Sequence, residues 1–333
     1  MGYIKLNEPV SIISFGSVAS KKEAGGPLKN YFDVVNVDTT FGQKSWEKSE
    51  SEIIKCAVNV ALGKANLKHS DVDVIFSGDL MNQCIASTFA IREMKIPFLG
   101  LYGACSTMAE SICIGSVFVS SGSATRAVCA TSSHFCSSER QYRYPLEYAS
   151  MRTPTSQWTV TGGGAVVLGK QDKPPFITDI FIGRIEDLGV TDQNNMGAAM
   201  APAAASTIKG FFDSTATAPD DYDAIFTGDL GSVGSELLYQ LLEKDKINVR
   251  HKHRDCGVMI FNPKTQSNVH AGGSGCGCGA SVLCSYVLNQ FKTGKFKNVL
   301  FIATGALLSP TSVLQGESIP TVAHLVHITS ERN

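Results

Sequence analysis

The chain has 333 residues, enough for two separate cores or for one duplicated α/β domain. Its 29 basic and 30 acidic residues give a formal net charge of -1, which leaves no basic excess for phosphate backbones, so we expect no nucleic-acid partner. Charged residues make up 18% of the chain, below the average of about a quarter, and we expect a homodimer interface to cover part of the surface.

The N-terminal residues 1–5 contain no apolar signal segment, and no apolar run reaches the roughly 18 residues that a membrane span requires. We therefore expect a soluble polypeptide without a transmembrane segment, or one peripheral to a membrane. Ten cysteines without a secretion signal are expected to be reduced thiols, most of them packed as small apolar side chains.

The first half of the chain predicts alternating helices and short strands. Residues 48–67 carry apolar side chains at helical spacing on a charged background. The β-branched and apolar run at 72–76 is typical of a buried strand. Further elements are predicted in this order: a helix over 82–94, a strand over 96–100, a long helix over 105–119 and a strand over 127–131.

The second half repeats the first. The sequence Phe-Ser-Gly-Asp-Leu at 76–80 recurs as Phe-Thr-Gly-Asp-Leu at 226–230, and in each half a cysteine, Cys105 or Cys278, precedes an Ala-Thr pair at the same spacing. Two landmarks in the same order indicate two copies of one supersecondary unit. The connection between motif and cysteine is longer in the second copy, and we expect the extra residues to form a surface excursion.

A polar connection with two prolines at 170–175 separates the two copies. We therefore predict an N-terminal half over residues 1–172 and a C-terminal half over 173–333. Alternating helices and short buried strands predict a layered α/β architecture with mixed sheets.

Cys105 is the first candidate for chemistry, because it lies at the start of a predicted helix directly after a strand. Free backbone N–H groups and the helix dipole favour a thiolate, or an anion beside it, at such a position. Cys105 is therefore predicted to be a nucleophile or a ligand contact. The alternative is a small residue at a crowded helix start.

Four segments resemble the thiolase and ketoacyl synthase superfamily. The resemblance implies a thiolase-like five-layer αβαβα fold, built from two pseudo-symmetric halves with mixed five-stranded sheets and with a cysteine nucleophile at a helix start. The segments are 57–62, 71–76, 103–106 and 162–167.

Condensing enzymes of this superfamily also place a His and a second His or Asn from the second half against the cysteine. The corresponding stretches here, 229–234 and 272–279, contain no His. Without these groups the oxyanion and proton-transfer machinery is lost. We therefore predict a degenerate site with no catalytic residue. The alternative is a Cys-dependent acyltransferase or thioesterase, with Cys105 as nucleophile and His134 as base.

A closer resemblance is to a family of stage V sporulation proteins of spore-forming Firmicutes. It implies a non-catalytic protein that binds dipicolinic acid (pyridine-2,6-dicarboxylate) during uptake of calcium dipicolinate into the developing spore. It also implies other stage V sporulation A membrane proteins as partners, in a channel complex at the spore inner membrane. The segments that carry this resemblance are 44–47, 78–83, 130–134, 139–145, 199–204 and 304–311.

A planar dianion suits a helix N-terminus flanked by hydroxyl and amide donors. Asp79 and Asp229 would repel that dianion if they faced it in the ionised form. They could instead approach it through a bridging calcium or accept hydrogen bonds within turns, and we favour the structural role in turns. A histidine after a pocket-forming strand is equally consistent with a ligand contact and with a structural role. The predicted ligand-binding residues are Cys105, Ser106, Thr107, Ser132, Ser133, His134, Asp79, Asn82, Asp229 and Cys278.

Two further clusters are interpreted as structural. Cys276 and Cys278, with Cys256 nearby, lack the spacing of a zinc site, so we predict packing thiols, no metal site and no cofactor beyond the ligand with its calcium. Arg140 and Arg143, interleaved with Tyr142 and Tyr144, could donate to a carboxylate or form a dimer contact, and surface or interface packing is the favoured interpretation.

Overall fold

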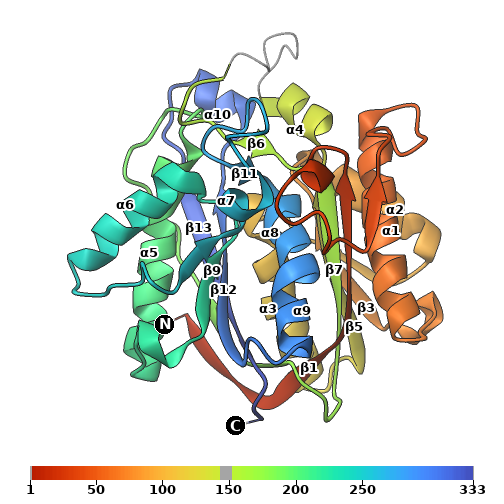
Figure 1. The fold of residues 1–333 in the computed structure, drawn as a ribbon. Helices are drawn as coiled ribbons and strands as arrows, with labels where there is room; N and C mark the ends of the chain where they lie inside the picture. The colour runs from red at the N-terminus through yellow and green to blue at the C-terminus, as the bar shows by residue number, and fades with distance from the viewer. Residues whose placement is uncertain (1, 143–151, 333) are drawn as a thin grey trace.

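The computed structural model describes residues 2–142 and 152–332, and its strands follow one continuous path made of two equivalent sets (Figure 1). In each set two antiparallel pairings are followed by two parallel pairings. The first set, in spatial order, is β1 (Tyr3–Ser20), β7 (Gly162–Gly169), β5 (Arg126–Ser133), β3 (Val74–Gly78) and β4 (Phe98–Gly100). The second is β8 (Phe176–Ile182), β13 (Thr321–Thr329), β12 (Asn298–Ala306), β9 (Ala224–Thr227) and β10 (His253–Asp255).

The long strand β1 joins the two sets, because its N-terminal part pairs antiparallel with β8 and its C-terminal part with β7. The chain passes from the first set to the second between β7 and β8, within the polar connection that the sequence marks. Three short strands lie outside the repeated order. They are β2 (Val34–Asn36), which pairs parallel with β1, and the parallel pair β6 (Trp158–Thr159) and β11 (Gly273–Ser274).

Helices form three layers around the two strand sets, which gives the predicted five layers (Figure 1). One outer layer holds α1 (Trp46–Lys64) and α2 (Ile85–Met94), and the opposite outer layer holds α5 (Met196–Thr215) and α6 (Gly231–Glu243). The central layer holds α3 (Thr107–Ser120), α8 (Cys276–Val282) and α9 (Leu288–Lys292), with a π-helical turn at Leu283–Val287 between the last two. The remaining short helices are α4 (Phe135–Tyr142), α7 (Cys256–Ile260) and α10 (Pro310–Leu314).

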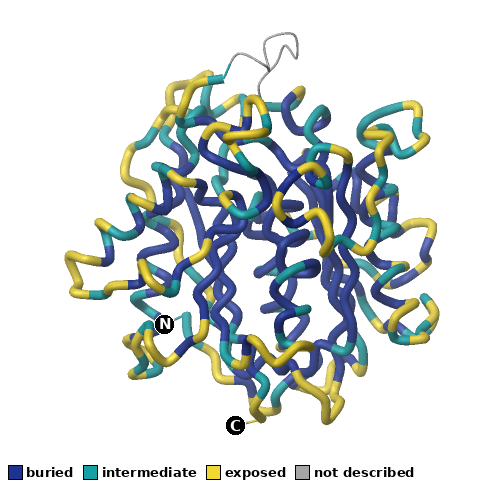
Figure 2. Tube along the Cα trace, in the orientation of Figure 1, coloured by how far each residue is buried: buried dark blue, intermediate teal, exposed yellow. Residues whose placement is uncertain are grey.

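Local sequence explains why α1 and α3 occupy different layers. Ser45 caps α1 by accepting a hydrogen bond from the backbone N–H of Lys48, and the buried side chains of α1 lie on one face. In contrast, α3 is buried on most sides and is rich in small residues. At Gly115 a Cβ would lie 2.6 Å from Sγ of Cys129, so this helix lies too close to β5 for a larger residue. The core is continuous through the central layer (Figure 2).

The prediction that the extra residues of the second half form a surface excursion was wrong for most of them. They follow β10, the counterpart of β4, and form α7 and β11, with Cys256, Ile260 and Val269 fully buried in the central core, whereas residues 262–268 are mostly exposed. The side chains of Cys256, Ile260 and Val269 pack under α8, which explains why the extra residues are ordered. Within residues 2–142 and 152–332, every helix is too short or too polar to cross a bilayer.

Candidate ligand-binding site

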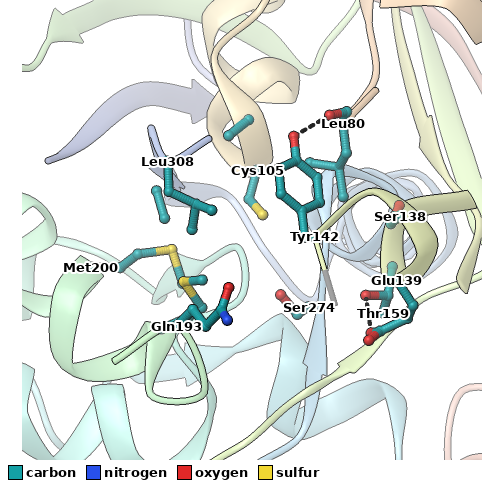
Figure 3. A pocket seen from close by; sticks show the side chains of 13 residues that line it. Leu80, Cys105, Ser138, Glu139, Tyr142, Thr159, Gln193, Met200, Ser274 and Leu308 are labelled. Atoms are coloured by element: carbon teal, nitrogen blue, oxygen red, sulfur yellow. Dashed lines mark hydrogen bonds between the residues drawn. The ribbon is translucent and has the colours of Figure 1, made fainter. Parts of the chain in front are cut away.

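Cys105 lies in a tight turn between β4 and α3. A 3-10 turn over Ala104–Ser106 leads into α3, and Ala104 has a φ of 50°, in the left-handed region that residues other than glycine rarely adopt. This backbone conformation holds Cys105 at the wall of a cavity between the two halves (Figure 3).

The cavity has walls from both halves of the chain. The first half contributes Cys105 and one end of α4, and the second contributes the start of α5, Ser274 of β11 and the end of β12. The cavity has a volume of about 80 Å³, which is room for a few waters or one small ring compound. Its lining residues are Leu80, Ala104, Cys105, Ser138, Glu139, Tyr142, Thr159, Gln193, Met196, Met200, Ser274, Ala306 and Leu308.

Asp229 faces Cys105 from the second half. Its carboxylate accepts a hydrogen bond from the backbone N–H of Gly275 at 2.9 Å and a long one from the Ser274 hydroxyl at 3.3 Å. The Cys105 thiol lies close enough to this carboxyl group for the two to shift each other's pKa. Burial is the main cause that raises the pKa of Asp229, to about 7.

The same contact keeps Cys105 protonated. Burial, followed by the negative charge of Asp229, raises the pKa of the Cys105 thiol well above its usual value. A nucleophilic cysteine is activated by a positive charge that favours the thiolate, and the negative charge of a nearby carboxylate has the opposite effect. The environment of Cys105 therefore opposes its activation as a nucleophile.

The other aspartate of the repeat, Asp79, is used within its own turn. Its carboxylate accepts hydrogen bonds from the backbone N–H of Met81 at 3.0 Å and from the backbone N–H and hydroxyl of Ser87 at 2.9 and 2.8 Å. Asp79 is fully buried and does not line the cavity. Burial raises its pKa to about 6, and the buried Glu50 lies close enough to be electrostatically coupled to it.

Three of the four predicted hydroxyl contacts, Ser106, Thr107 and Ser133, are engaged with the backbone. Ser106 donates to the carbonyl of Gly103 and Thr107 to that of Ala104, both at 2.7 Å. Ser133 donates to the carbonyl of Val160 at 2.7 Å and accepts from the N–H of Gly277. Ser132 is buried near Glu50. These four side chains shape the walls behind the cavity, and a ligand contact by any of them stays a prediction.

His134 turns away from the cavity. Its Nε2 lies 2.8 Å from the carbonyl oxygen of Thr39, and its Nδ1 accepts a hydrogen bond from the backbone N–H of Cys136 at 3.1 Å. These partners assign the proton to Nε2, and burial lowers the pKa of the ring. With both nitrogens engaged, His134 is a neutral structural group in this conformation.

The remaining predicted residues lie at the rim and in the core. Asn82 is exposed at the rim, where its Oδ1 accepts hydrogen bonds from Tyr102 and Gln141, each at 3.2 Å. Tyr142 covers the cavity beside Cys105, and its hydroxyl donates to the carbonyl of Leu80 (Figure 3). Cys278 packs in the central core and does not line the cavity.

Neighbouring clusters are structural in this geometry. The Sγ of Cys276 donates to the carbonyl of Ser132 at 2.9 Å. Nowhere in the described ranges do three or more His, Cys, Asp or Glu side chains gather as metal ligands. Arg140 forms an ion pair with Glu47. Arg143 and Tyr144 lie outside the described residues.

Sequence reasoning missed a buried ion pair in the cavity wall. Glu139, which lines the cavity, is 2.8 Å from the guanidinium of Arg152, and their side chains are 2% and 1% exposed. The Thr159 hydroxyl donates to the same carboxylate at 3.1 Å, and Arg152 lies over the Trp158 ring, which stacks on Phe135. The two charged residues are thirteen positions apart and follow no periodic pattern, so only the fold brings them together.

Two pseudo-symmetric α/β halves in five layers, with a cysteine at the start of a central helix, define a protein of the thiolase-like fold. Solved structures of several enzymes share this fold, and three of them serve as examples. They are OleA of Xanthomonas campestris (11% identity, 98% of this chain and 99% of that chain, TM-score 0.62), 3-oxoacyl-[acyl-carrier-protein] synthase III of Aquifex aeolicus (15%, 96% and 99%, 0.59) and human mitochondrial 3-ketoacyl-CoA thiolase in complex with CoA (13%, 99% and 100%, 0.59).

A narrower assignment comes from sequence comparison. The profile of the family "Stage V sporulation protein AD" matches residues 2–329. Stage V sporulation protein AD of Bacillus subtilis (strain 168) is 47% identical over 316 residues, which cover 95% of this chain and 93% of that protein. The chain belongs to the Stage V sporulation protein AD family and has a role in sporulation. Both predicted resemblances are thereby confirmed.

Proposed function

We propose that this protein is a non-catalytic binding protein for dipicolinate, and that it acts in uptake of calcium dipicolinate into the developing spore. In this proposal it works at the spore inner membrane with other stage V sporulation A proteins, which are embedded in the membrane. Family membership supports the sporulation role. The proposal for the ligand rests on the chemistry of the cavity.

The observation that carries the proposal is the pairing of Cys105 with Asp229. A condensing enzyme needs a thiolate, or a base that makes one, and donors for the oxyanion that follows. Here the thiol lies beside a carboxyl group whose negative charge disfavours the thiolate, and no histidine stands among the described residues that line the cavity. The cavity is therefore suited to hold a small molecule without attacking it.

The acidic groups of the cavity can coexist with a dianionic ligand. The charge of Glu139 is offset by Arg152 at 2.8 Å inside the same wall. Asp229 lies behind the lining residues Cys105 and Ser274, and with a pKa of about 7 it is partly protonated near neutral pH, so its charge repels a dianion less than a fully ionised carboxylate would. Binding of dipicolinate should therefore be coupled to uptake of a proton by Asp229.

Calcium can enter this cavity as part of the cargo. Calcium prefers oxygen ligands, and a chelating ring compound leaves some of its coordination sites open. The cavity wall offers oxygens of Glu139, Thr159 and Ser274. We include the calcium complex of dipicolinate in the proposed ligand class for that reason.

The edge strand β4 supports a homodimer as the working unit. It pairs only with β3 among the described strands, which leaves its outer edge open. Beside this edge Leu99 and Tyr102 are each 48% exposed and Phe89 is 41% exposed. Tyr102 also contacts the Tyr142 hydroxyl at the cavity rim, so a dimer through this edge would lie next to the site.

Calorimetric titration of dipicolinate, with and without calcium, tests the proposal. We expect saturable binding to the wild-type protein and binding at least about tenfold weaker to Cys105→Ala and to Asp229→Ala. His134→Gln is a matched control, because its ring lies outside the cavity. Absence of saturable binding under both conditions would refute the proposal. Acylation of Cys105 by an acyl-CoA, seen as an intact-mass increase that Cys105→Ala abolishes, would establish the acyltransferase alternative instead.

A further inference from the structure

Two segments next to the cavity expose large apolar side chains on their outer side. One precedes α5 and carries Ile185 and Leu188, which are 62% and 68% exposed. The other follows β12, and its Leu314, at the end of α10, is 88% exposed. Gln193 from the first segment and Leu308 from the second line the cavity on the inner side. The exposed side chains are therefore carried by the same segments that form the cavity wall.

Hydrogen bonds hold these segments together as one surface. Backbone bonds of 2.8 Å join Glu186 to Thr321 in both directions, and another of 2.8 Å runs from the N–H of Ile319 to the carbonyl of Val190. The hydroxyl of Ser318 donates to Asp187 at 2.6 Å. The two segments form a fixed surface and not two independent loops.

A groove continues this surface toward the outer helices. It lies between the segment 181–188 and helices α5 and α6, and its volume is about 890 Å³. Leu188 is shared by the surface and the groove, and Pro202 and Leu241 contribute apolar walls. An elongated segment of another protein would fill the groove and cover Leu188 together.

The two segments carry a negative charge, whereas the groove beside them is balanced, with Arg184, Lys209 and Lys244 against Glu186, Asp213 and Asp245. Arg184 forms an ion pair with Glu186 at 2.7 Å. Asp187, Asp192 and Glu317 are exposed, and within residues 2–142 and 152–332 none of them pairs with a Lys or an Arg. The hydrogen bonds from Ser318 and from the backbone N–H of Gly189 lower the pKa of Asp187, so this carboxylate is charged at neutral pH. Three uncompensated negative charges surround the exposed apolar side chains.

We propose that this surface docks a basic amphipathic segment of a partner protein, in which apolar side chains are flanked by Lys or Arg. The acidic rim argues against a lipid surface, because cytoplasmic leaflets are anionic and would repel it. It also argues against a second copy of this chain, because a two-fold contact would place the same carboxylates against one another. The inference does not depend on which ligand the cavity binds.

The test uses the full-length protein and two short helical peptides, one of leucine and lysine and one of leucine and glutamate. Calorimetry should show binding of the lysine peptide only. Asp187→Asn/Asp192→Asn/Glu317→Gln, which keeps the loop hydrogen-bond acceptors, should weaken binding at least about tenfold, and so should Leu188→Ser/Leu314→Ser. The matched controls are Glu8→Gln/Glu331→Gln for the acidic residues and Val37→Ser for the apolar ones. They change exposed residues away from this surface, and binding should stay within about twofold of wild type.

Three results would overturn the inference. The first is equal affinity of the lysine peptide for the wild type and both surface variants. The second is binding of the protein to phosphatidylserine vesicles that Leu188→Ser/Leu314→Ser abolishes, which would identify a membrane-binding surface. The third is self-association in sedimentation that the same variant abolishes, which would identify an interface between copies of this chain.

Discussion

The two copies of the Phe-Ser/Thr-Gly-Asp-Leu motif have nearly the same sequence and different surroundings. Both follow equivalent parallel strands, β3 and β9, and both place a fully buried aspartate after the strand. Asp79 is saturated by donors from Met81 and Ser87 of its own half. Asp229 instead reaches Cys105 of the other half and Gly275 before α8. One copy of the motif builds a turn within its own half, and the other supports residues of the cavity wall from behind.

The glycine before each aspartate gives the largest expected difference between the copies. A Cβ at Gly78 would lie 1.9 Å from the backbone carbonyl oxygen of Leu101, which cannot move without breaking the pairing beside β4. The nearest atom to a Cβ at Gly228 is Cα of Ala303 at 3.3 Å. We expect Gly78→Ala to lower the free energy of unfolding by about 3 kcal/mol or more, and Gly228→Ala by about 1 kcal/mol or less.

Urea denaturation followed by circular dichroism measures both values, and the two variants serve as controls for each other. If Gly78→Ala does not fold, Gly78→Ser should fail as well, while Gly228→Ala remains soluble and folded. Equal losses in the two alanine variants would show that the two turns are packed alike, contrary to the comparison above.

The pH dependence of stability separates the two aspartates next. Burial raises the pKa of Asp229 to about 7 and that of Asp79 to about 6, against about 3.9 in an unfolded chain. Each protonated carboxyl contributes stability that is fully present below pH 4 and is lost as the pH rises through the folded-state pKa. Between pH 6 and 7 we expect Asp229 to account for a loss of about 1 kcal/mol.

Asp229→Asn should therefore flatten the decline in unfolding free energy between pH 6 and 7. Asp79→Asn should leave that part of the decline in place and change the part between pH 4 and 6. Urea midpoints are measured from pH 4 to 8 for the wild type, Asp229→Asn and Asp79→Asn. The difference between each variant and the wild type removes the contribution of the other buried carboxyl groups, which all three proteins share. A wild-type decline that Asp229→Asn leaves unchanged between pH 6 and 7 would contradict the assignment.

The sequence predicted the halves of this molecule better than it predicted the contacts between them. Periodicity and the repeated landmarks predicted α1, α3, α6 and the strands β3, β5 and β9, whereas β1, β7, β8 and β13 were not predicted from local patterns. The repeated motif gave Asp79 and Asp229 equal weight as candidates. Their difference depends on Cys105, which approaches Asp229 only when the two halves pack together.

The prediction for His134 shows the same limit. Its position after β5 was consistent with a cavity residue, but the direction of the ring is set by Thr39, which is far away in sequence. The connection before α8 was predicted to be a surface excursion because its polar residues hid the apolar ones that enter the core. Local patterns report elements, whereas side-chain direction and burial depend on contacts distant in sequence.

The smallest expected difference is in the reactivity of Cys105. Asp229 is the second cause, after burial, of the raised pKa of this thiol, so Asp229→Asn should increase its thiolate fraction while burial continues to limit it. We expect alkylation of Cys105 by iodoacetamide at pH 8 to become about threefold faster in Asp229→Asn, measured for each cysteine by peptide mass spectrometry.

Asp79→Asn is the matched control and should leave the rate unchanged, because Asp79 is not among the groups that shift the pKa of Cys105. Partly exposed Cys56 reports in every sample whether the variants have loosened the whole fold. Equal acceleration of Cys105 and Cys56 would mean that Asp229 acts on stability alone, whereas a selective change at Cys105 would mean that this aspartate sets the protonation of the cavity.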